Sequence, residues 1–166
     1  MKMFVSAVGA AFALGACAPQ QAATGADAAS VEAGRHLVLV GACNDCHTPG
    51  YAEANGAVPE AQWLTGTPVG FRGPWGVSYP ANLRNVVAAM SEDEWAQSLK
   101  ARTGLPPMPW GALNAMDETE LRSLYRFIKS LGPGGEDMPT ALPPGEPVRT
   151  PTFWFVPLAP GERSPP

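Results

Sequence analysis

The run Cys43–His47, with the sequence CNDCH, limits the possible folds of this chain more than any other stretch. Two of the three cysteines lie here, three positions apart, and a histidine follows the second one directly. Residues 30–42 carry apolar side chains at helical spacing, so we expect a helix that leads into the run. Residues 48–90 are rich in glycine and proline and show no apolar–polar alternation, so we expect no strands there. Because such a chain has little core of its own, we expect something other than side chains to fill its centre.

Three kinds of site use paired cysteines at this spacing. A thioredoxin-like redox pair is expected within a β-α-β unit, and no strands are expected around this run. A structural zinc site needs four ligands, and only His36, on the same helix, could join the three residues of the run. The sequence Cys-x-x-Cys-His is instead typical of c-type haem attachment through two thioethers and an axial histidine. The run therefore predicts haem c bound through Cys43 and Cys46, with His47 on the iron, and this macrocycle would fill the centre.

The N-terminus has the layout of a secretory signal peptide. Lys2 is followed by an apolar run that ends in the sequence LGAC, with the cysteine at position 17. Small residues directly before a cysteine resemble the lipobox of bacterial lipoproteins, which implies removal of residues 1–16 and lipidation of Cys17. An ordinary signal peptide with a coincidental cysteine is the alternative. Residues 17–29 are small and polar, and we expect them to form a flexible tether from the lipid anchor.

These features predict an exported protein on the periplasmic face of a membrane. Ala18 after the cysteine favours the outer membrane, because it does not resemble a retention signal of the aspartate kind. The chain carries 11 Lys and Arg against 15 Asp and Glu, and it has no basic patch that would suggest nucleic-acid binding. No later apolar run is long enough for a transmembrane helix. The lipid anchor is therefore the expected link to the membrane.

One mostly α-helical domain is expected over residues 30–131. Besides the helix before the cysteines, Ser91 and Glu94 form the pattern of a capping box, which predicts a second helix from this point. Asp117, with Glu120 three residues later, predicts the start of a third helix, which has a continuous apolar stripe. Three main helices and long irregular loops are therefore expected.

An extended tail is expected after this domain. Residues 132–166 contain ten prolines, too many for a helix or a central strand. The aromatic run Phe153–Phe155 would be costly to expose to water. We therefore expect the tail to pack along the domain or on a partner.

A second axial ligand decides whether the iron only exchanges electrons or also binds small molecules. Met108 lies in the loop LPPMPW between the last two predicted helices, where three prolines would hold a thioether in place. We therefore predict Met108 as the sixth ligand, with a core methionine beside Trp110 as the alternative reading of this residue. Four other residues are less favoured candidates. Met90 and Met116 directly precede helix starts, Met138 lies in the tail, and His36 lies on the helix that leads to the attachment site.

Three segments resemble class I monohaem cytochromes c, above all those that are subunits or partners of periplasmic dehydrogenases. They are GRHLVLVGACNDCHTP, FRGPWGVSYPANL and PPMPWGALNAMDETELRSLYRFIKSL, and together they cover most of residues 30–131. The resemblance implies the class I cytochrome c fold around one covalent haem. It also implies that the first and last helices cross tightly, with Gly34 against Tyr125 or Phe127.

The same resemblance implies that the middle segment contacts the haem propionates. The positions that match are Arg72, Trp75, Tyr79 and Asn82. The stretch from Asn82 to Ser91 departs from the family, because it is short and carries Arg84 where threonine is usual. This departure concerns the propionate contacts and neither iron ligand.

With His47 and Met108 both on the iron, no coordination position stays open, so we predict an electron carrier and not an enzyme. Its expected partners are redox proteins, with a periplasmic or membrane dehydrogenase as donor and an oxidase or another cytochrome of the respiratory chain as acceptor. A gas-binding sensor is the alternative if Met108 does not bind the iron. A fixed cytochrome subunit of a multi-component dehydrogenase is a second alternative, which the aromatic tail suggests.

Overall fold

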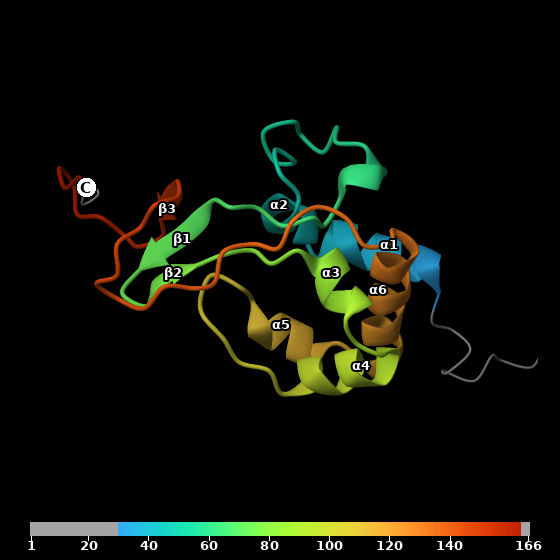
Figure 1. Cartoon of the computed structure of the whole chain (residues 1–166). Coiled ribbons are helices and arrows are strands. Elements are labelled where there is room, and N and C mark those ends of the chain that lie inside the picture. The colour runs from blue at the N-terminus through green and yellow to red at the C-terminus, as the bar shows by residue number, and fades with distance from the viewer. Residues whose placement is uncertain (1–29, 164–166) are drawn as a thin grey trace, which may run out of the picture.

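The computed structural model of the protein describes residues 30–163, which form six α-helices and a small three-stranded sheet (Figure 1). The predicted signal peptide, the tether and the lipidation site Cys17 lie outside the described residues. No helix within this range is both long and apolar enough to cross a membrane. In chain order the elements are α1 (Val31–Val40), α2 (Cys43–His47), the 3₁₀ helix η1 (Glu60–Gln62), β1 (Gly70–Gly73), β2 (Gly76–Ser78), α3 (Leu83–Ala88), α4 (Glu92–Lys100), α5 (Trp110–Ala115), α6 (Glu118–Ser130) and β3 (Thr152–Trp154).

Helices α1 and α6 pack against each other and form the centre of the helical part (Figure 1). They approach closely at Gly34, where a Cβ atom would lie 1.9 Å from the carbonyl oxygen of Ser123 and 2.8 Å from Cβ of Phe127. A residue without a side chain is needed at such a contact. The backbone N–H of Ser30 also donates to Oγ of Ser123, at 3.2 Å. The expected contact between Gly34 and Phe127 is confirmed.

The helix starts that the sequence predicts are present. Ser91 precedes α4 and exchanges hydrogen bonds with Glu94, and Asp117 precedes α6 and exchanges them with Glu120, so both ends are closed by capping boxes. The indole N–H of Trp95 on α4 donates to the Leu121 carbonyl at 2.9 Å and ties the two helices together. The apolar core around them contains Val38, Trp63, Leu64, Val87, Ala96, Leu99, Leu121, Leu124, Phe127 and Ile128.

The sequence does not predict α3 and α5, which are six residues long each. Helix α3 buries only Val87, and no residue of α5 is fully buried, so neither helix shows an apolar stripe. Helix α3 depends on a polar cap instead, because Oδ1 of Asn82 accepts the backbone N–H groups of Arg84 and Asn85.

The expectation of no strands in residues 48–90 is wrong. Strands β1 and β2 form an antiparallel hairpin, and β3 of the tail pairs in parallel with β1, which gives the strand order β2-β1-β3. The strands are three or four residues long, and β1 and β2 contain three glycines, so the sequence shows no alternation. The expected fold class is corrected to a mixed fold in which helices predominate.

The tail returns from the end of α6 to the sheet, along the chain between β2 and α3 (Figure 1). Its strand β3 lies at the edge of the sheet, where a proline-rich segment is tolerated. The ring of Phe71 on β1 contacts two tail rings, at centroid distances of 5.7 Å to Phe153 and 5.8 Å to Phe155. The outer faces of these two tail rings stay half exposed.

Candidate functional site

The run of two cysteines and a histidine forms α2, a single helical turn after α1. The chain turns between the two helices at Gly41 and at Ala42, whose φ of 54° is left-handed. Residues three and four apart lie on one face of a helix, so Cys43, Cys46 and His47 share a face of α2. Both thiols are free and half-buried. The two sulfur atoms and the imidazole ring therefore lie on the same face of α2.

The ring of His47 is oriented by a distant part of the backbone. Its Nδ1 lies 2.8 Å from the carbonyl oxygen of Ala81. Because a carbonyl only accepts hydrogen bonds, Nδ1 carries the proton and Nε2 keeps its lone pair. The side chain is only 7% exposed, and burial lowers the pKa of His47, which favours the neutral ring. A neutral imidazole with a second-sphere acceptor at one nitrogen is the usual form of a metal-ligating histidine.

The two thiols are not activated for nucleophilic chemistry. Burial raises the pKa of Cys43 to about 11, and it raises the pKa of Cys46 as well. Reactive cysteine pairs have thiols whose pKa is lowered, so that a thiolate forms near neutral pH. This environment therefore does not support a thioredoxin-like redox role for the pair.

A small polar network fixes the end of α2. The hydroxyl of Thr48 donates to Oδ1 of Asn44 at 2.7 Å and accepts the backbone N–H of Leu64 at 2.8 Å. The backbone N–H of Gly66 donates to the His47 carbonyl at 2.7 Å. These bonds hold the backbone at the end of α2 against residues 64–66, while the Ala81 carbonyl binds the ring of His47.

Met108 is half-buried and lies on a separate element, the loop between α4 and α5, most of which is exposed. The loop is tied to β2, because Oγ of Ser78 donates to the Pro106 carbonyl at 2.5 Å. At the start of α5, the Arg102 guanidinium lies 5.2 Å from the centre of the Trp110 ring. In the view of Figure 1, the chain from β2 to α3 runs between α2 above and α5 below.

The other candidate ligands have different surroundings. Met90 and Met116 pack against the apolar core, as expected. His36 is exposed on α1. Met138, in the tail, is half-buried, and its Cγ would lie 2.5 Å from a Cβ atom added at Gly66. It is therefore a packing residue of the tail.

The four residues predicted to contact the propionates lie on or beside the hairpin, and each has a partner in the hairpin or in the tail. The Arg72 guanidinium stacks over the Trp154 ring at 5.1 Å, and the Trp75 indole N–H donates to the Phe71 carbonyl at 3.3 Å. The hydroxyl of Tyr79 lies 2.7 Å from that of Thr150.

Asn82 uses its whole amide within the protein. Its Nδ2 donates to the carbonyls of Gly134 at 2.7 Å and Glu136 at 3.0 Å, while its Oδ1 caps α3. An amide has two hydrogens to donate, so none is left for a propionate. The structure thus gives Asn82 a role that the sequence does not indicate.

Nε1 of Trp154 on β3 is one of four buried polar atoms that have no hydrogen-bond partner within the described residues, and the other three lie on α2 and α5. They are Nδ2 of Asn44, Nε1 of Trp110 and Oδ1 of Asn114. Buried polar atoms normally have partners, so each of these three atoms is available to a bound polar group. The sequence indicates Trp110 only as a neighbour of Met108 and does not indicate Asn114, because an unpaired atom is visible only in a structure.

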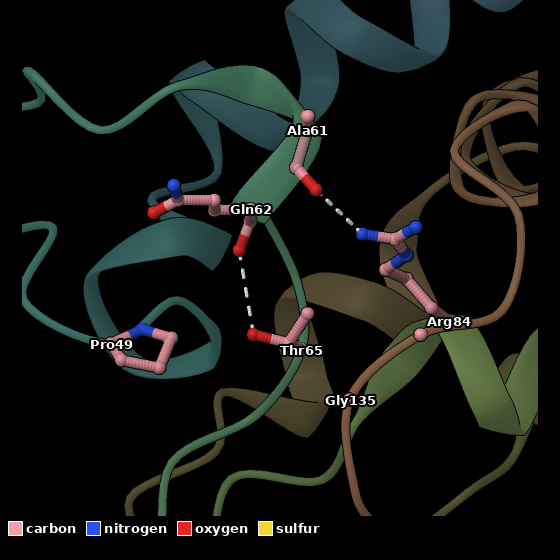
Figure 2. Close-up of a pocket in the computed structure, with 7 residues that line it drawn as sticks. Pro49, Ala61, Gln62, Thr65, Arg84 and Gly135 are labelled. Atoms are coloured by element: carbon pink, nitrogen blue, oxygen red, sulfur yellow. Dashed lines mark hydrogen bonds between the residues drawn. The ribbon is translucent and has the colours of Figure 1, made fainter.

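A pocket of about 450 Å³ lies elsewhere, where the tail leaves α6 (Figure 2). Figure 2 shows Arg84 extending towards Ala61, whose carbonyl accepts from Nη1 at 2.8 Å. The other guanidinium nitrogens donate to the carbonyls of Leu131 and Gly132, both at 2.5 Å, and so cap the end of α6. None of the predicted haem-binding residues lines this pocket. Its lining is Pro49, Ala61, Gln62, Thr65, Arg84, Gly134 and Gly135.

No group of three His, Cys, Asp or Glu side chains within residues 30–163 could hold a metal ion on its own. No protein-family model, curated protein or solved structure matches the chain.

Proposed function

We propose that the protein is a class I monohaem c-type cytochrome that relays electrons from a periplasmic or membrane dehydrogenase to the respiratory chain. The observation that carries this proposal is the arrangement on α2. Two free thiols share a helical face with a buried histidine whose Nδ1 is bonded to the Ala81 carbonyl at 2.8 Å. This arrangement leaves Nε2 of His47 as the nitrogen that can bind iron.

The residues present fit a covalently attached haem. Each thiol, of Cys43 and of Cys46, would add its sulfur to one carbon of a vinyl group and its hydrogen to the other, so that a thioether forms without oxidation. His47 would supply one axial ligand and Met108 the other. The unpaired Trp110 indole N–H is a suitable donor to a carboxylate of the same group. When bound, haem supplies an iron that is reversibly oxidised and reduced by one electron.

Electron transfer is favoured over catalysis because His47 and Met108 would both bind the iron and leave no position open for a substrate. A thioether stabilises reduced iron, and a buried site disfavours the added charge of oxidised iron, so both effects raise the reduction potential. The raised pKa values of the two thiols also speak against a role of the cysteines as nucleophiles.

A second candidate function is that of a fixed cytochrome subunit in a multi-component dehydrogenase. The observation that favours it is the exposure of two tail rings, since Phe153 is 55% and Phe155 is 50% exposed. Exposed aromatic clusters are typical of protein interfaces. Purification from membranes without detergent-resistant partners would contradict this second candidate.

The test of the proposal is a haem-stained denaturing gel of protein exported in a host that attaches haem c. We expect a stained band at the mass of the wild-type chain and none for Cys43→Ala/Cys46→Ala. Cys17→Ser is the matched control, because it removes the third cysteine and should keep the stain. A stained band in the double variant would contradict attachment at α2.

A further inference from the structure

The tail contacts the chain on both sides of Ala81, the residue whose carbonyl accepts the ring N–H of His47. We use the name strap for residues 134–154, and we use the name crossed segment for residues 77–85, which lead from β2 into α3. Figure 1 shows the strap returning from α6 along the crossed segment to the sheet.

Two contacts hold the crossed segment before Ala81. Val77 and Leu142 exchange two backbone hydrogen bonds, at 2.8 and 2.9 Å. The hydroxyls of Tyr79 and Thr150 are 2.7 Å apart and form a further bond. The strap therefore fixes both the backbone and a side chain directly upstream of Ala81.

Further contacts hold the crossed segment after Ala81. The buried amide of Asn82 donates to the carbonyls of Gly134 at 2.7 Å and Glu136 at 3.0 Å. Asn85 donates to a carboxylate oxygen of Asp137 at 2.9 Å and accepts the Gly134 N–H at 3.3 Å. Ala81 thus lies between two groups of strap contacts.

Residues 64–67 hold the same segment through backbone bonds. The N–H of Thr67 donates to the Pro80 carbonyl at 3.2 Å, and the N–H of Leu83 donates to the Leu64 carbonyl at 3.0 Å. Because residues 64–66 also bind α2, this loop links the crossed segment to the helix of His47. The strap adds the side-chain contacts that the loop lacks.

We infer that the strap positions the Ala81 carbonyl and thereby the ring of His47, so that Tyr79, Asn82 and Thr150 are positioning residues for the axial ligand. A hydrogen bond weakens steeply when its acceptor moves out of line, so a small shift of the crossed segment weakens the bond to Nδ1. The ring then rotates more freely, and its proton exchanges faster with water.

The effect on the iron rests on the proposed function. A histidine that donates strongly from Nδ1 is a more basic ligand at Nε2 and stabilises oxidised iron. Loss of a strap contact should therefore raise the reduction potential. The exchange of the Nδ1 proton, in contrast, reports on the strap whether or not haem is attached.

The experiment uses the full chain and two variants that remove strap contacts from opposite sides. Thr150→Val removes the hydroxyl bonded to Tyr79 without changing the crossed segment. Asn82→Asp keeps the oxygen that caps α3 and loses the amide donor to Gly134 and Glu136. Exchange of the His47 Nδ1 proton is measured by nitrogen-15 NMR in the presence of a reductant. We expect exchange about three- to tenfold faster in each variant, the factor for loss of one ordinary hydrogen bond.

Thr140→Val is the matched control, because Thr140 is an exposed strap residue without a hydrogen bond to the crossed segment. We expect wild-type exchange in this control. Wild-type exchange in both Thr150→Val and Asn82→Asp would overturn the inference, as would an equal acceleration in Thr140→Val. If Asn82→Asp does not fold, the exchange rate of the His47 Nδ1 proton in Thr150→Val alone tests the inference. Absence of haem from the wild type would contradict the proposed function and leave this test in place.

Discussion

Replacement of Gly34 by alanine tests the packing of α1 on α6, which holds α2 in place. A Cβ atom at this position would lie 1.9 Å from the Ser123 carbonyl oxygen and 2.5 Å from its carbonyl carbon. These are backbone atoms in the middle of α6, so no side-chain rotation relieves the clash. The two helices would have to separate by roughly 1–2 Å to reach ordinary van der Waals contact.

The expected cost is a few kilocalories per mole. Overpacking a close contact costs about 1–3 kcal/mol, and the larger value applies here because α1 and α6 form the main helix contact. The higher helix propensity of alanine than of glycine offsets up to about 1 kcal/mol of this destabilisation. Gly34→Ala should therefore lower the free energy of unfolding by about 2 kcal/mol, a large part of the 5–15 kcal/mol of a typical domain.

Urea unfolding followed by tryptophan fluorescence measures this loss. With a slope of about 1–3 kcal/mol per molar urea, the midpoint should fall by roughly 1 M. Gly111→Ala is the matched control, because Gly111 lies in α5 and nothing would lie within 4 Å of its Cβ atom. This control should gain up to about 1 kcal/mol. Equal stability of Gly34→Ala and the wild type would refute the close crossing.

Met108→Ala should abolish the far-red charge-transfer band of the oxidised protein, lower its reduction potential and let the reduced iron bind carbon monoxide. Met90→Ala is the control and should keep the band, the potential and the lack of carbon monoxide binding. If the wild type lacks the band and binds carbon monoxide, the protein is a sensor. Arg84→Ala should lower the free energy of unfolding by about 2 kcal/mol, because three carbonyls lose a charged donor, and an unchanged urea midpoint would contradict this. Cys17→Ser should move the haem protein from the membrane fraction to the soluble periplasmic fraction, and retention in the membrane would contradict lipidation.

The parts of the fold that could be predicted are those with local causes. Ser91 and Asp117 identify the starts of α4 and α6 because a capping box needs residues only three positions apart. The apolar stripe of α6 follows from its 3.6-residue period. The contact of Gly34 came from a family resemblance and not from spacing, because no local pattern indicates which glycine meets another helix.

The parts that could not be predicted have distant causes. Strand β1 pairs with β3, which lies about eighty residues later in the chain, and neither strand has an alternating pattern long enough to detect. At the candidate site, the positions of the two cysteines and the histidine follow from the sequence. The acceptor of the His47 ring is a backbone carbonyl 34 residues away, and a backbone group leaves no mark in the sequence.

The stretch after Asn82 is held by contacts with the end of α6 and with the start of the tail. Arg84 caps the end of α6 with bonds to the carbonyls of Leu131 and Gly132. That contact places the first residues of the tail beside Asn82, whose amide then binds Gly134 and Glu136. The bonds of Arg84 and Asn82 therefore form one arrangement with the start of the tail, next to Ala81, whose carbonyl orients His47.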